Sequence, residues 1–123
     1  MAEDTVYGIK ENKSLVPIET GGSGTQVTVG TYTGDGQSVR TIDLGYKPNN
    51  IFIFTVEKPF CTMGGTGTYI QSYAAVASGA YNSAGVYLVD NGFMVQQATG
   101  GTPPDGIKRN MNETSKTYVY FIW

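Results

Sequence analysis

Apolar and polar residues alternate along two early stretches of the chain, which is the pattern of half-buried β-strands. The stretch TQVTVGTYT alternates from Thr25, and the stretch VRTIDLG alternates from Val39. Asp35-Gly36, a dipeptide that favours tight turns, lies between them. These two strands are therefore predicted to form an antiparallel hairpin.

Two other stretches, IFIFTV (51–56) and TYVYFIW (117–123), are apolar at nearly every position. A strand of this kind needs cover on both faces, from a second sheet or from a partner chain. Both stretches are therefore predicted to be central strands. Chain ends usually fray, so the aromatic load of residues 118–123 indicates an interior strand. Its side chains are expected in the core or an interface in preference to a ligand site.

The second half of the chain gives one clear hairpin and two ambiguous regions. VYLVDNGFMVQQ (86–97) is predicted to form two strands around Asn91-Gly92. Residues 98–115 contain Pro103-Pro104 and are predicted to form a long loop. Residues 57–85 favour one or two short strands, and a short helix over 71–78 is left open.

The fold class follows from these strands and from the composition. The 123 residues include 17 glycines and 9 tyrosines, which is typical of strands joined by glycine turns. We expect an all-β protein, an antiparallel, jelly-roll-like β-sandwich over residues 25–123. Residues 1–24 are predicted to form an extended N-terminal arm and linker, because they lack a clear period and end in GGSG.

Charge and targeting features narrow the partners. Charged residues make up 15% of the chain and the net charge is -2, which gives no electrostatic reason to expect nucleic acid or an anionic membrane. No window approaches a membrane span, and the N-terminal residues lack a signal-peptide pattern, so we expect a chain that begins in a cytoplasm. Cys61 is the only cysteine and is expected to be a small buried residue.

The sequence offers little catalytic chemistry. It contains no histidine, so it cannot form a Ser-His-Asp or Cys-His arrangement, and one cysteine cannot form a zinc site. We expect no enzyme activity, cofactor or metal. An alternative remains open, a carbohydrate-active module with two carboxylates drawn from Asp35, Asp43, Asp90 and Asp105. Three of these, Asp35, Asp90 and Asp105, lie at or near glycine turns, which explains them without catalysis.

Tyrosine is the residue type that most favours a binding surface, since it offers rigid contact area with a polar tip. Four tyrosines fall in or near the ambiguous middle of the chain. The candidate binding or interface residues are Tyr69, Tyr73, Tyr81 and Tyr87. Packing in the core is the alternative for each of them.

Three stretches resemble β-modules of tail fibres and related virion proteins of tailed bacteriophages. GTYTGDGQSVRTIDLGYKPNNIFIF resembles the opening hairpin, turn and apolar strand of these modules. DNGFMVQ and MNETSKTYVYFIW resemble their later hairpin and closing strand. The similarity covers about residues 29–54 and 86–123. VYGIKENKSLVPI (6–18) is similar to N-terminal segments that serve attachment or assembly in phage tail proteins, and the candidate assembly residues are Tyr7, Leu15, Val16 and Ile18.

This resemblance implies a non-enzymatic structural protein of the virion, assembled in the host cytoplasm as part of a tail fibre, tip or baseplate. It implies a homo-oligomer, with a trimer favoured, that contacts other virion proteins through the arm. Binding of a host-surface glycan or protein is a further expectation, without nucleic acid and without membrane insertion. A capsid decoration protein, whose arm clamps neighbouring subunits, is the structural alternative.

Overall fold

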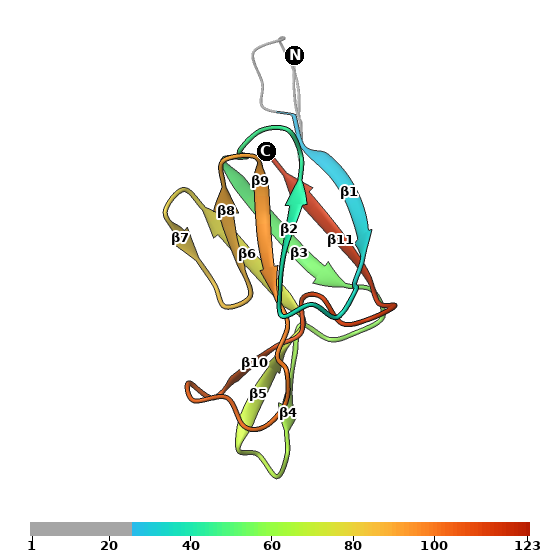
Figure 1. The fold of residues 1–123 in the computed structure, drawn as a ribbon, viewed down its shortest axis with the longest axis vertical. Coiled ribbons are helices and arrows are strands. Elements are labelled where there is room, and N and C mark those ends of the chain that lie inside the picture. Colours follow the sequence, from blue (N-terminus) through green and yellow to red (C-terminus); the bar gives the residue numbers. More distant parts are fainter. Residues whose placement is uncertain (1–25) are drawn as a thin grey trace, which may run out of the picture.

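A computed structural model describes residues 26–123 of the chain (Figure 1). The arm residues Tyr7, Leu15, Val16 and Ile18 lie outside the described residues. The described part is all-β and contains no helix, which confirms the all-β part of the predicted fold class. Its strands are β1 (Thr28–Thr33), β2 (Val39–Asp43), β3 (Asn50–Thr55), β4 (Cys61–Gly64), β5 (Tyr69–Ser72), β6 (Ala74–Ser78), β7 (Tyr81–Asn82), β8 (Val86–Val89), β9 (Gly92–Gln96), β10 (Ile107–Arg109) and β11 (Thr117–Ile122).

The largest sheet has five antiparallel strands in the order β1-β11-β3-β6-β7. Both stretches that are apolar on two faces lie inside it, since β11 pairs with β1 and β3, and β3 pairs with β11 and β6. The prediction that the last strand is interior is therefore confirmed. Its ladder bonds are made on both edges, so they hold the end of the chain in place.

The core lies between this sheet and a three-stranded antiparallel sheet of order β2-β9-β8, which lies in front of it in Figure 1. Inward side chains of the two sheets meet there, and the central ones are 0% exposed. The five-stranded sheet contributes Ile53 and Tyr118, and the three-stranded sheet contributes Val86, Phe93 and Val95. Burying such large apolar side chains is worth about 1.5–3 kcal/mol each. The core thus uses one face of β11 and of β3.

Two stacked tyrosines bring polar groups into this core. The rings of Tyr32 and Tyr118 lie 4.8 Å apart, centroid to centroid, and are nearly parallel. Tyr32 Oη donates to the carbonyl oxygen of Met111 at 2.7 Å, and Tyr118 Oη donates to that of Asn110 at 2.7 Å. Burial raises the pKa of both tyrosines, that of Tyr118 to about 12. Both hydroxyls are therefore neutral donors with satisfied partners, and these tyrosines are structural.

A small mixed sheet, β10-β5-β4, extends from one end of the molecule in Figure 1. β5 pairs with β10 in parallel, Ile70 opposite Ile107, so a short strand lies inside the predicted loop 98–115.

Residues 57–85 form four strands, and residues 71–78 form no helix. In β6, Ala75 and Ala77 face the core and Val76 faces out, which is the period of a strand. Cys61 is exposed, because β4 lies away from the core, and its predicted burial was wrong.

The predicted hairpin of β1 with β2 was also wrong. β1 pairs with β11, whereas β2 pairs with β9 in the facing sheet. The turn between β1 and β2 bonds instead to the segment before β11, because Gly36 N donates to the carbonyl oxygen of Asn112 and Gly34 N donates to that of Lys116, both at 2.8 Å. The Asp35-Gly36 turn therefore carries the chain from one sheet to the other.

The hairpin of β8 and β9 is confirmed, but its turn residues are Asp90 and Asn91. Gly92 belongs to β9 and lies opposite Asp43 of β2. A side chain at Gly92 would collide with the carbonyl oxygen of Ile42. This glycine is therefore required by the close approach of β2 and not by the turn.

Glu57 provides a first test of local strain. Its φ of 65° lies in the left-handed region, at the third position of the turn Thr55–Lys58, where glycine is the preferred residue. We expect Glu57→Gly to raise the free energy of unfolding by about 0.5–1 kcal/mol, because it removes this strain. Urea denaturation measures the change. Lys58→Gly, at a position without positive φ, should lower stability, and a loss in both variants would contradict the prediction.

Candidate functional site

The outer face of the five-stranded sheet is the most unusual surface of the described residues. The five strands contain no charged residue at all. Their outward side chains form cross-strand rows, set by the register. One row runs through Val29, Phe121, Phe52 and Val76, and the next through Thr31, Val119, Phe54 and Ala74. A sheet face that meets water normally carries polar side chains, so this composition indicates a surface that binds something.

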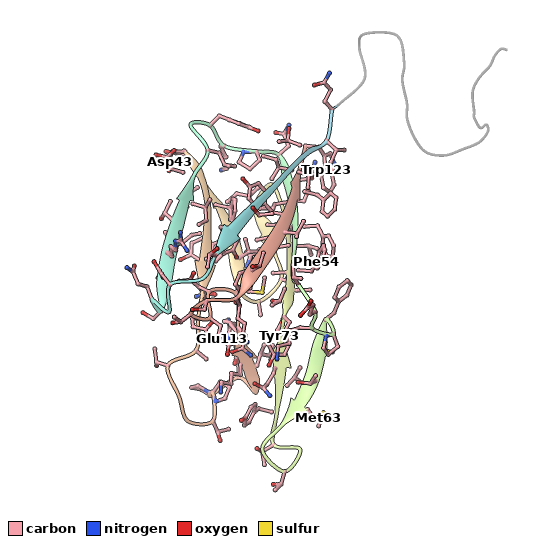
Figure 2. All side chains as sticks on the ribbon, turned by 90° about the vertical axis from the view of Figure 1, so that its right-hand side faces the viewer. Asp43, Phe54, Met63, Tyr73, Glu113 and Trp123 are labelled. Atoms are coloured by element: carbon pink, nitrogen blue, oxygen red, sulfur yellow. The ribbon has the colours of Figure 1, made fainter. Side chains whose placement is uncertain are left out.

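Four phenylalanines form the centre of this face. We call Phe52, Phe54, Phe60 and Phe121 the phenylalanine cluster. The ring of Phe121 lies 6.3 Å from each of Phe52 and Phe54, and Phe60, which precedes β4, lies edge-on to Phe52 at 5.7 Å. Phe60 remains 57% exposed. Figure 2 shows Phe54 and Trp123 on the same side of the molecule.

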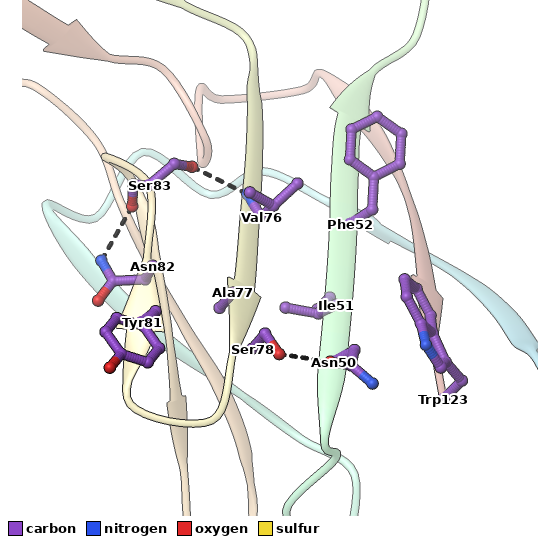
Figure 3. A pocket seen from close by; sticks show the side chains of 10 residues that line it. All are labelled: Asn50, Ile51, Phe52, Val76, Ala77, Ser78, Tyr81, Asn82, Ser83 and Trp123. Carbon is purple, nitrogen blue, oxygen red and sulfur yellow. Dashed lines mark hydrogen bonds between the residues drawn. The ribbon is translucent and has the colours of Figure 1, made fainter.

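A different row crosses the end of the same face. Trp123 and Asn50 are joined by two backbone hydrogen bonds, of 3.0 and 3.2 Å, Asn50 is opposite Ser78, and Ser78 is opposite Tyr81. We call these four residues the aromatic row. Two aromatic side chains thus flank an amide and a hydroxyl, across four adjacent chain segments (Figure 3).

Hydrogen bonds fix the centre of the aromatic row. The Asn50 amide lies 2.6 Å from Ser78 Oγ. The Asn50 amide lies between the side chains of Ser78 and Trp123. Each of them has a hydrogen-bond partner when the amide nitrogen faces Ser78 and the amide oxygen accepts from Trp123 Nε1 at 3.0 Å. The indole ring and the amide therefore hold each other in position.

The aromatic row lines a hollow with a volume of about 390 Å³. Phe52 and Val76 contribute outward apolar side chains to its lining. The lining also includes Ile51 and Ala77, whose side chains face the core, and the polar residues Asn82 and Ser83. Among residues 26–123, no charged side chain lines it. Trp123 is 41% exposed and Tyr81 is 83% exposed, so both rings are accessible.

The four candidate tyrosines lie in different parts of the fold. Tyr81 lines the hollow. Tyr69 is in β5 of the small sheet, with Lys108 Nζ 5.9 Å from its ring centre. Tyr73 is buried between β5 and β6, and this burial raises the pKa of its hydroxyl, while Tyr87 is half-buried in β8. A binding role for Tyr69, Tyr73 and Tyr87 stays a prediction.

The four candidate carboxylates lie in or beside turns. Asp35 accepts from Gln37 N, and this hydrogen bond, followed by that from Asn112, lowers the pKa of its carboxyl group. Hydrogen bonding by Arg109 lowers the pKa of Asp105. A general acid requires a raised pKa, so neither group suits that role.

Within residues 26–123, no three His, Cys, Asp or Glu side chains cluster as metal ligands, and no helix has the length and apolarity of a membrane span.

The residues that the sequence did not single out are Asn50 and Ser78. Each is an ordinary polar residue at the end of a strand, and only the register between β3 and β6 places them side by side.

Comparisons of the chain with protein-family models, with curated protein sequences and with solved structures find no match.

Proposed function

We propose that this chain is a non-catalytic structural component of a tailed-phage virion, in a tail fibre, tip or baseplate, which self-associates through the phenylalanine cluster. The observation that carries the proposal is the uncharged outer face, on which Phe52, Phe54 and Phe121 remain only half-buried. A second copy would remove these rings from water at about 25 cal/mol per Å² of apolar surface. A trimer is the favoured assembly.

The contacts between the segments that resemble phage modules support this proposal. The GDG turn and the MNE segment are 77 residues apart at Asp35 and Asn112, yet Asn112 Nδ2 donates to the Asp35 carboxylate at 2.6 Å. The resemblance thus falls on parts that fold as one unit. Our proposal includes the finer architecture, a jelly-roll-like antiparallel sandwich with an N-terminal arm that contacts other virion proteins. Its support is the packing of two antiparallel sheets around one core.

The double variant Phe54→Ser, Phe121→Ser tests the proposal. The parent chain should elute as an oligomer, at a multiple of its 13.2 kDa mass by light scattering, and should be found in purified phage particles by mass spectrometry. The double variant should be a folded monomer that is not incorporated, because two apolar anchors are lost from the interface centre. Tyr46→Ser, which removes a 51% exposed ring elsewhere, is the control and should behave as the parent.

Two results would contradict the proposal. A parent chain that remains monomeric at high micromolar concentration would show that the phenylalanine cluster does not drive self-association. A chain that is absent from purified particles would exclude a place in the virion.

A further inference from the structure

We propose that the hollow at the aromatic row binds a neutral oligosaccharide. The inference goes beyond the proposed self-association, which uses the phenylalanine cluster, and does not depend on it. It rests on three properties of the hollow, namely the lack of charge among its described lining residues, its pairing of aromatic rings with polar groups, and its length.

The absence of charged side chains among the described lining residues selects a neutral ligand. A phosphate, a carboxylate or an ammonium group would leave water without gaining an opposite charge, which is costly. A neutral sugar carries its polarity as hydroxyl groups, which both donate and accept hydrogen bonds. The amide and hydroxyl groups of Asn50, Ser78, Asn82 and Ser83 match this chemistry.

The aromatic rings complement the other half of a sugar's surface. One face of a pyranose ring presents C–H groups, which pack against the face of an aromatic side chain. Trp123 and Tyr81 present such rings at the two ends of the row, both exposed to solvent. A wholly apolar occupant fits less well, because it would cover the amide of Asn50 and the hydroxyl of Ser78 without offering them partners.

The length of the row indicates several linked sugars. Trp123 follows β11 and Tyr81 is in β7, so three strand spacings separate them, a span of about 14 Å at about 4.8 Å each. This exceeds the width of a single pyranose ring. The hollow volume of about 390 Å³ falls within the usual range of ligand sites, about 300–1,000 Å³.

The site is also held rigidly, which lowers the entropic cost of binding. Its polar centre lies on paired strands, and Asn50 is fixed by Ser78 and by the indole of Trp123. Ser83 Oγ accepts from Val76 N at 2.9 Å, which attaches the segment after β7 to β6. Few groups need to be ordered when a ligand arrives.

Trp123 is the only tryptophan of the chain, so its fluorescence reports on the hollow directly. The full chain is titrated with maltotriose, cellotriose, mannotriose and triacetylchitotriose. At least one of these trisaccharides should change the emission saturably. Tyr81→Ala and Asn50→Ala should each weaken that binding about three- to tenfold, the effect of losing one stacking or hydrogen-bonding group. Calorimetry should show no binding to Trp123→Ala, and Tyr46→Ala should bind as the parent does.

Three outcomes would overturn the inference. The first is that none of the four trisaccharides changes the emission or gives binding heat at millimolar concentration. The second is that a sugar binds to Tyr81→Ala and to Trp123→Ala as tightly as it binds to the parent chain, which would place its site elsewhere. The third is that phenylalanine amide saturates the emission change and no sugar does, which would assign the hollow to an apolar protein segment. Because the Phe54→Ser, Phe121→Ser chain, whose substitutions lie outside the lining of the hollow, should still bind the sugar as a monomer, this test and that of self-association can fail separately.

Discussion

A chain that ends at Tyr118 is expected not to fold. The deletion removes Val119–Trp123 and with them most of β11, which separates β1 from β3 in the five-stranded sheet. β1 pairs with no other strand of the described residues and would be left without a ladder. Ile122 is 2% exposed and Tyr120 packs edge-on against Phe93 at 5.1 Å. Losing several such side chains, each worth about 1.5–3 kcal/mol when fully buried, approaches a typical total stability of about 5–15 kcal/mol.

Circular dichroism and a solubility assay on the expressed truncated chain measure this result. β3 would gain an open apolar edge, so we expect aggregation together with the loss of folded signal. Phe121→Ser is the matched control, since it changes the outward face of the same strand and keeps the ladder and the core intact. A soluble truncated chain that melts cooperatively near the parent temperature would show that β11 is peripheral.

The strands that the sequence predicted best are those whose composition leaves little choice. β3 and β11 carry apolar residues on both faces, and a strand of this kind is stable only between neighbours and against a core. The hairpin of β8 and β9 was predicted from Asn91-Gly92, which overlaps the actual turn Asp90-Asn91 by one residue, and this signal acts over a short distance in the chain. Both signals are local, so the sequence alone contains them.

Two features could not be predicted, namely the strand with which β1 pairs and the residues of the aromatic row. Both depend on contacts that the sequence does not display. A favourable turn at Asp35-Gly36 predicted a hairpin, but hydrogen bonds to Asn112 and Lys116, far along the chain, direct the strands into different sheets. The aromatic row exists because of the register of four chain segments, and a shift of one residue would move every side chain to the other face. Tyr81 was a candidate from the sequence, whereas its partners Asn50 and Ser78 could not be identified.

Asn112→Ala is expected to cost about 3 kcal/mol or more of the free energy of unfolding. Asn112 is 0% exposed, and its amide nitrogen donates to the Asp35 carboxylate at 2.6 Å and to the carbonyl oxygen of Gln37 at 3.1 Å. Its amide oxygen accepts from Asp35 N and from Arg40 Nη1, both at 3.2 Å. The alanine variant leaves several of these groups without partners in a part-buried place, and each such group costs about 1–3 kcal/mol. Asn49→Ala, which truncates an exposed amide, should change little.

The pH dependence of this loss separates the hydrogen-bond network from simple packing. The hydrogen bond from Gln37 N, and next that from Asn112, lowers the pKa of Asp35 in the folded state. The resulting stabilisation is complete above the unfolded-state pKa, about 3.9, and is lost as the pH falls through the lower folded-state pKa. Asn112→Ala removes one cause of the lowered pKa, so urea denaturation should show a larger stability difference from the parent at about pH 7 than at about pH 2. An equal difference at both pH values would mean that Asn112 contributes through packing and neutral hydrogen bonds alone.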